Sequence, residues 1–283
     1  MAVDLSGYMG RGILSGLTSK GEPADVYFAE GRSPPSRMRK LEPCPKHGIV
    51  HMDINSETDL EKLRADGGDP ALLLYDAMRG DPEGLLVVSN GYQTDHDADM
   101  SGGTFHGLIK EKGIFQRVRR DRFPLGEAVE WTLAQTGSEP DPLRTARIAV
   151  ARDYVKTPDR TNIGVVIHPR DIDGKIVMDD KREKYLAKDI TVGYRNVPLK
   201  NGEFIIFATY GVHTPSFENP QPPEVSTLGR LARRVYLDGT NPEQLADEVF
   251  GLLPEIVRVG VAAAMRDDSQ PMGFRFAKRN VKE

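Results

Sequence analysis

The residues best suited to chemistry in this sequence follow an apolar run at 85–88. Asn90 can both donate and accept hydrogen bonds, and Gly91 permits a backbone conformation that exposes amide groups. Thr94 and Asp95 add a hydroxyl and a carboxylate. Junctions between a strand and a turn commonly host binding sites. Asn-Gly is also a leading dipeptide of β-hairpin turns, so these residues by themselves favour a plain turn over a site.

A second candidate is the stretch GRSPPSRMRK at 31–40, in which two prolines separate Arg32 from Arg37. Each guanidinium is a planar fork that can bind phosphate oxygens in a bidentate manner. Prolines reduce the entropy lost when the loop is held in place. The pair therefore suits phosphate, although the residues alone are also those of a solvated basic loop.

Two groups of residues resemble metal sites without matching a known pattern. Cys44, His47 and His51 precede Asp53, but there is no second cysteine pair and the spacing fits no common zinc signature. His96 lies among aspartates in a run that lacks the EF-hand pattern. We therefore expect no metal. GxSxG, Walker A and a GxGxxG that follows a strand are also absent from the sequence.

The composition is that of an ordinary globular protein, with 39% hydrophobic and 28% charged residues among 283. The formal net charge of −4 argues against broad nucleic-acid binding. The first residues lack the basic and apolar regions of a secretory signal, and the lone Cys44 cannot form an intramolecular disulfide. We expect a cytoplasmic protein that binds neither nucleic acid nor membranes.

The elements that would position these residues follow from apolar spacing and turn signals. The segments 8–18 and 26–28, on either side of a turn at Gly21, predict a β-hairpin. Ser56 with Asp59 resembles a capping box and predicts a short surface helix. Further strands are expected at 85–88, 146–151, 163–168 and 203–209, the last of them buried on both faces.

Two longer helices have clear signals. The first begins at Pro124, carries apolar residues on one face and ends before Gly137, and the second begins after Asn241-Pro242. Strands come first and the helices do not strictly alternate with them, which favours an α+β fold over a doubly wound parallel sheet. The charged stretch 169–202 and the proline-rich stretch 212–225 are interpreted as insertions into a single domain spanning 1–283.

Together these motifs resemble the archaeal-type inosine monophosphate (IMP) cyclohydrolase family, in order and almost end to end. YMGR at 8–11 is similar to that family's Y-x-G-R, and GRSPPSR at 31–37 to its S-R-S-F-P-N-R. Tyr75-Asp76 stands against Y-N-C, and VVSNGYQTD at 87–95 is the most specific match, to V-V-S-N-G-S-H-T-D. TARIA at 145–149, preceded by two acidic residues, and Thr209-Tyr210 also have counterparts.

The resemblance implies a four-layer αββα sandwich like that of the N-terminal-nucleophile hydrolases, without self-processing. Such an enzyme needs an exposed Cys, Ser or Thr at its mature N-terminus, whereas the start of the family aligns at Tyr8. The chain departs from the family pattern at two places. Ala77 and Met78 stand where the family has a cysteine, and Gln93 stands where it has a histidine.

The implied reaction closes the purine ring of 5-formamidoimidazole-4-carboxamide ribotide to give IMP and water, and it requires no metal or organic cofactor. The resemblance assigns proton transfer to Tyr75 and Glu139, phosphate binding or oxyanion stabilisation to Arg32 and Arg37, and carboxamide recognition to Asn90. The remaining substrate-binding residues that it implies are Arg11, Ser89, Gly91, Thr94, Asp95, Asp141 and Arg147.

Two other functions remain open on the sequence. One is a purine-nucleotide binder without catalysis, which kept the pocket while losing the cysteine and histidine. The other is an amide hydrolase on the same fold, for which an N-terminal nucleophile is missing. We also expect the chain to self-associate as a homo-oligomer.

Overall fold

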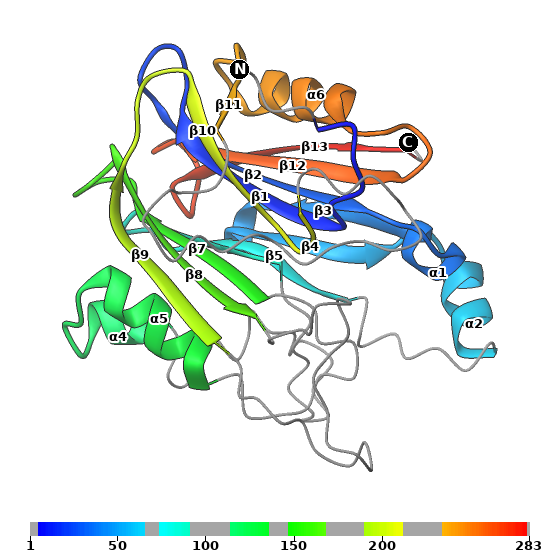
Figure 1. The fold of residues 1–283 in the computed structure, drawn as a ribbon, viewed down its shortest axis with the longest axis horizontal. Coiled ribbons are helices and arrows are strands. Elements are labelled where there is room, and N and C mark those ends of the chain that lie inside the picture. Colours follow the sequence, from blue (N-terminus) through cyan, green and yellow to red (C-terminus); the bar gives the residue numbers. More distant parts are fainter. Residues whose placement is uncertain are drawn as a thin grey trace.

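The computed structural model describes residues 5–65, 74–90, 114–135, 147–167, 190–211 and 234–281. These residues form two antiparallel β-sheets that face each other and carry helices on their outer faces (Figure 1).

The first sheet has six strands in the order β11-β10-β1-β2-β12-β13. Its centre is the predicted hairpin of β1 and β2, which turns through Gly21 with a φ of +83°. That φ is in the left-handed region, which favours glycine. The strands are β1 (Arg11–Leu17), β2 (Pro23–Glu30), β10 (Glu203–Ala208), β11 (Arg234–Tyr236), β12 (Arg258–Arg266) and β13 (Phe274–Asn280).

The second sheet has seven strands that follow one another in chain order, from β3 to β9. Each pairs antiparallel with the next. The strands are β3 (Arg39–Cys44), β4 (Ile49–Ile54), β5 (Tyr75–Gly80), β6 (Leu85–Ser89), β7 (Arg147–Asp153), β8 (Arg160–Ile167) and β9 (Ile190–Pro198).

Three apolar clusters separate the layers. The largest contains residues of both sheets, such as Ile13 and Val150, and therefore lies between them. A second joins the outer face of the six-stranded sheet to α6 (Pro242–Leu252). A third joins the outer face of the seven-stranded sheet to α4 (Ile114–Arg119) and α5 (Leu125–Gln135). The layers thus follow the order helix, sheet, sheet, helix (Figure 1).

Close packing of α5 against β9 depends on Gly193. A Cβ atom at this position would lie only 1.7 Å from Oε1 of Glu130, so no larger residue fits without moving that side chain. At the side of the sandwich, the side chain of Asn280 on β13 accepts the N–H of Leu41 at 2.9 Å and donates to its carbonyl at 3.1 Å. This pair of bonds ties an edge of one sheet to an edge of the other.

The α+β class is confirmed, as are the predicted hairpin, the short helix α2 (Glu57–Ala65) and the helices α5 and α6. β6, β7, β8 and β10 are at the predicted places, and every residue of β10 is buried. α6 begins as expected, because the side chain of Asn241 accepts the N–H of Gln244 at 2.9 Å.

The structure corrects the prediction of a loop at 31–40. Ser33 caps a short helix, α1 (Pro34–Arg37), and β3 begins two residues later. The short 3-10 turn at Pro45–His47 then leads into β4. β9 lies inside the stretch 169–202 that was interpreted as an insertion, whereas 168–189 and 212–233 are outside the described residues.

Candidate functional site

The two sheets are joined by side chains at the end of the sandwich where β1, β5 and β7 begin. The hydroxyl oxygens of Tyr27 and Tyr75 lie 2.6 Å apart, and Nδ2 of Asn90 donates to Oγ1 of Thr209 at 2.8 Å. Each of these hydrogen bonds joins the six-stranded sheet to the seven-stranded sheet. We call the polar residues that face each other there the inter-sheet cluster, which comprises Arg11, Tyr27, Arg39, Tyr75, Asn90 and Thr209.

Tyr75 is the first residue of β5 and is buried, with its ring turned towards the other sheet. The guanidinium carbon of Arg11 lies 5.8 Å from the centre of that ring, and the same guanidinium donates to the Tyr75 hydroxyl. Burial alone would lower the pKa of Arg11, but the oxygens of Tyr75 and Tyr27 raise it above its ordinary value. Arg11 is therefore a firmly charged group beside two phenols.

Tyr27 has the opposite character, because its proton is hard to remove. Burial is the main reason that the pKa of Tyr27 is raised well above its ordinary value, and the neighbouring Tyr75 oxygen adds to the effect. A phenol that keeps its proton acts as a hydrogen-bond donor, so Tyr27 can donate to an oxygen that carries negative charge.

Arg39, the first residue of β3, faces the inter-sheet space, whereas sequence reasoning chose Arg37. It is buried and lies on the same face of β3 as Leu41, a residue of the inter-sheet core. Its Nε donates to the carbonyl of Ser36 at 2.9 Å, and its Nη2 to the carbonyl of Glu30 at 3.3 Å. The strand alternation of Arg39 with Leu41 is the signal that could have found it.

Arg37 is exposed and bonds to its own loop. Its Nε donates to the carbonyl of Gly31 at 3.0 Å, and its Nη2 to that of Arg32 at 3.1 Å. These contacts stabilise the segment around α1. They leave Arg37 less available to a ligand than a guanidinium without such partners would be.

Asn90 forms the bridge between the sheets at their polar end. It follows β6 and is fully buried. Its Oδ1 accepts the N–H of Ile148 at 2.6 Å, while Thr209 also donates its hydroxyl to the carbonyl of Arg11 at 3.1 Å. The chain of contacts from Asn90 through Thr209 to Arg11 fixes where β1 begins relative to the second sheet.

An aromatic group lies beside the inter-sheet cluster. The rings of Tyr8 and Tyr210 are 5.6 Å apart, and the guanidinium carbon of the exposed Arg32 lies 5.2 Å from the first ring centre and 5.9 Å from the second. Burial raises the pKa of Tyr8, to which Tyr210 and Glu30 add, whereas Arg32 and Arg39 oppose the rise. This arrangement presents one charged and two aromatic groups side by side.

Glu30 is a further residue that sequence reasoning did not identify. It is 1% exposed and its Oε2 accepts the N–H groups of Met9 and Gly10 at 2.6 and 3.0 Å. Burial raises the pKa of Glu30 to about 8, even though those two hydrogen bonds work in the other direction. Only its burial, which the sequence does not show, distinguishes it from an ordinary strand-end glutamate.

The structure does not bring every predicted residue to this site. Alternation along β6 and β7 turns Ser89 and Arg147 towards the outer face, because their neighbours Val88 and Ile148 belong to the inter-sheet core. Ala77 and Met78 are buried in that core. The predicted residues Gly91, Gln93, Thr94, Asp95, Glu139 and Asp141 lie outside the described residues.

No group of three or more potential metal-binding side chains occurs in the described ranges. Sγ of Cys44 lies 3.2 Å from Nδ1 of His47, and His51 instead forms an ion pair with Asp76. The hydrogen bond to Asp76 is the main reason that the pKa of His51 is raised.

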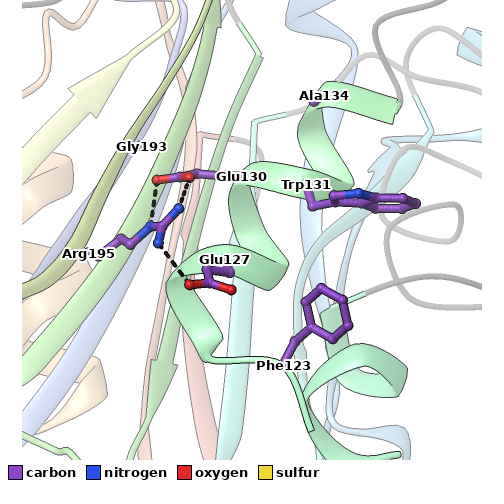
Figure 2. Close-up of a pocket in the computed structure, with 7 residues that line it drawn as sticks. All are labelled: Phe123, Glu127, Glu130, Trp131, Ala134, Gly193 and Arg195. Atoms are coloured by element: carbon purple, nitrogen blue, oxygen red, sulfur yellow. Dashed lines mark hydrogen bonds and ion pairs between the residues drawn. The ribbon is translucent and has the colours of Figure 1, made fainter. Parts of the chain in front are cut away.

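A separate open hollow of about 420 Å³ lies between α5 and β9 (Figure 2). Phe123 and Trp131 line one part of it, and Arg195 lines another. The guanidinium of Arg195 binds Glu130 and Glu127, each with a nitrogen at 3.0 Å from an oxygen. The charged groups of the hollow are thus engaged with one another, so it offers less chemistry than the inter-sheet cluster.

No protein-family model matches the sequence, and no curated protein matches it at a significant level. None of the helices in the part of the chain that the structure describes is long and apolar enough to cross a membrane.

Proposed function

We propose that this protein is an IMP cyclohydrolase that closes the purine ring of 5-formamidoimidazole-4-carboxamide ribotide. The observation that carries the proposal is the position of Tyr75, whose buried hydroxyl lies 2.6 Å from that of Tyr27 and beside the guanidinium of Arg11. Helices outside two facing sheets also support the proposed relation to the N-terminal-nucleophile hydrolase fold.

The reaction joins the carboxamide nitrogen to the formyl carbon within one molecule. One proton from the carboxamide nitrogen and one from the formamido nitrogen leave with the formyl oxygen as water. The enzyme must hold the groups in contact, stabilise negative charge on that oxygen and move these protons. Each of these tasks can be carried out by side chains without a metal or an organic cofactor.

Tyr75 is the proton-transfer residue in this proposal. The hydroxyls of Tyr27 and Tyr75 share a hydrogen bond, and Arg11 supplies a positive charge next to Tyr75. Tyr27 and Arg11 can both donate hydrogen bonds to negative charge that develops beside Tyr75 during the reaction. General acid–base assistance of this kind contributes a factor of about 10²–10⁴.

The anionic ligand is held by arginines. Arg11 and Arg39 face the inter-sheet space, and neither forms an ion pair with a carboxylate of the described residues. These two arginines therefore have the main anion-binding role in place of Arg37, with Arg32 at the exposed edge beside Tyr8 and Tyr210. Glu139 remains the second proposed proton-transfer group on the motif resemblance alone.

The test is to incubate the purified protein with the formamido ribotide and to follow IMP by its absorbance. We expect IMP to form, with Tyr75→Phe prepared in parallel to show that a contaminating enzyme is not responsible. Tyr236→Phe is the matched control, because Tyr236 is 56% exposed on β11, away from the cluster. A folded protein that makes no IMP contradicts the proposal.

Binding of a purine nucleotide without turnover is the second candidate. It is favoured by Asn90, whose side-chain amide already bonds to Ile148 and Thr209 and so has less capacity for a carboxamide. Tight IMP binding in calorimetry, combined with no IMP formation from the ribotide, would select this function. Self-association is also still a prediction, which sedimentation velocity of the purified chain would test.

A further inference from the structure

The chain enters β1 through the segment Tyr8, Met9 and Gly10, which bends at Gly10. Gly10 has a φ of +76°, and a Cβ atom there would lie 2.9 Å from the ring of Tyr210. Glu30, at the end of β2, both donates hydrogen bonds to this segment and accepts them from it. Its N–H donates to the carbonyl of Gly10 at 2.6 Å, and its Oε2 accepts the N–H groups of Met9 and Gly10.

The segment carries two residues of the candidate site. Tyr8 lies at its start, stacked near Arg32, and Arg11 follows it directly and reaches Tyr75. Glu30 itself is on the other face of β2, because Val26 and Phe28 pack under α6 while Tyr27 and Ala29 face the second sheet. The Glu30 carboxyl group therefore reaches Tyr75 through the segment at 8–10, not by direct contact.

The Glu30 carboxyl group is buried with little to neutralise it. Its Oε1 has no hydrogen-bond partner among the described residues. The charged and titratable groups around it are Tyr8 on the entering segment, Arg39 on β3 and Arg258 on β12. Arg39 donates to the backbone carbonyl of Glu30, and Arg258 to the carbonyl of Phe250, so neither forms an ion pair with the carboxyl group.

We propose that Glu30 is a positioning residue for the candidate site, which holds Arg11 against Tyr75 through the N–H groups of Met9 and Gly10 and holds it more tightly when ionised. Hydrogen bonds to a charged acceptor are stronger than those to a neutral one. The same bonds hold Tyr8 beside Arg32. The effect on catalysis rests on the proposed function, whereas the effect on the geometry of Tyr75 does not.

The kinetic test compares Glu30→Gln with wild type between pH 6 and pH 9. Glutamine keeps an oxygen acceptor for the two N–H groups but carries no charge, so we expect similar kcat/KM at pH 6 and a deficit of about 5-fold at pH 9. Glu248→Gln is the matched control, because Oε2 of Glu248 accepts the N–H groups of Asp238 and Gly239 at 3.0 and 2.9 Å on α6. It should match wild type at every pH.

A second measurement needs no turnover. In wild-type protein labelled with ¹³C at the tyrosine ring carbon that bears oxygen, the Tyr75 resonance should move as the Glu30 carboxyl group titrates, although the two side chains do not touch. Glu30→Gln should abolish that inflection, and Tyr75→Phe identifies the resonance.

Three outcomes would overturn the proposal. They are parallel pH profiles of kcat/KM for wild type and Glu30→Gln, a deficit of the variant that is equal at all pH values, and a Tyr75 resonance without the inflection. If wild type makes no IMP, the proposed function alone fails, and the resonance still decides the role of Glu30.

Discussion

Each end of the sandwich places an arginine between the two sheets, but the two arginines have different partners. At the end opposite the candidate site, the fully buried Arg152 donates to the carbonyl of Gly16 at 2.7 Å and to Oγ of Ser15 at 2.6 Å. Its Nη2 also lies 3.6 Å from Oδ1 of Asp25. The hydroxyl of Tyr154 donates to Oδ2 of the same aspartate at 2.6 Å. The charge of Arg152 is therefore balanced within the protein.

Arg11 has phenols where Arg152 has a carboxylate. Its contacts are the ring and hydroxyl of Tyr75 and the nearby oxygen of Tyr27, and no ion pair joins it to a carboxylate of the described residues. The difference indicates two purposes for the same set of residue types. At one end the arginine is paired with a carboxylate inside the protein, and at the other the arginine lies among tyrosine hydroxyls.

The largest expected effect comes from the two tyrosines. Tyr75→Phe should lower the rate of IMP formation by about 10²–10⁴, because it removes the proposed proton-transfer group. Tyr154→Phe should leave the rate nearly unchanged and lower the free energy of unfolding by about 1–3 kcal/mol, because Asp25 loses a hydrogen-bond donor. Steady-state kinetics and urea unfolding of both variants measure the two effects. Equal losses of rate in the two variants would show that the two ends of the sandwich do not differ.

The arginines themselves should differ in stability. Arg152→Leu leaves Asp25 buried without its cation, so we expect a loss of about 3–5 kcal/mol in the free energy of unfolding. Arg11→Leu leaves no described carboxylate behind and should cost clearly less. Arg275→Leu is the surface control, because Arg275 is an exposed partner of Glu243 and should cost under about 1 kcal/mol. Urea unfolding of the three variants gives the order, and an equal loss for Arg11 and Arg152 would contradict the comparison.

Glu30 adds a pH dependence to one end of the molecule. Its pKa is about 8 in the folded protein against a usual 4.5, so the unfolded chain releases this proton at lower pH than the folded one. The contribution of Glu30 to stability is therefore greatest below about pH 4.5 and is lost as the pH rises to about 8. We expect wild type to lose on the order of 2–4 kcal/mol relative to Glu30→Gln between pH 5 and pH 8. Unfolding curves of the two proteins that shift equally with pH would show that Glu30 is not the cause.

The smallest expected effect concerns one hydrogen bond between the sheets at each end. Thr209→Val removes the acceptor for Asn90, and Thr161→Val removes the acceptor for Ser15, which lies at 3.0 Å. Each should cost about 1–2 kcal/mol in unfolding free energy. Only Thr209→Val should also slow IMP formation, because Thr209 holds the start of β1 at Arg11. A kinetic defect in Thr161→Val of the same size would remove this distinction.

The sequence by itself determined the elements with strong local signals. The turn at Gly21 predicted the β1–β2 hairpin, and Asn241 before Pro242 predicted the start of α6. Turn geometry and helix capping depend on residues within a few positions of each other, so a single sequence contains them. Arg11, Tyr75 and Asn90 were also chosen from sequence motifs, and the structure brings them to one end of the sandwich.

Tertiary structure alone decided which polar residues face which layer. Strand register and the sheet that lies opposite decide three features. They pair Arg152 with Asp25, turn Arg39 rather than Arg37 towards the inter-sheet space, and turn Ser89 outward. Burial of Glu30 likewise requires the segment at 8–10 to fold over the end of β2. These contacts join residues far apart in the chain, so local propensity cannot predict them. Burial then determines the protonation and the hydrogen bonding of the polar side chains involved.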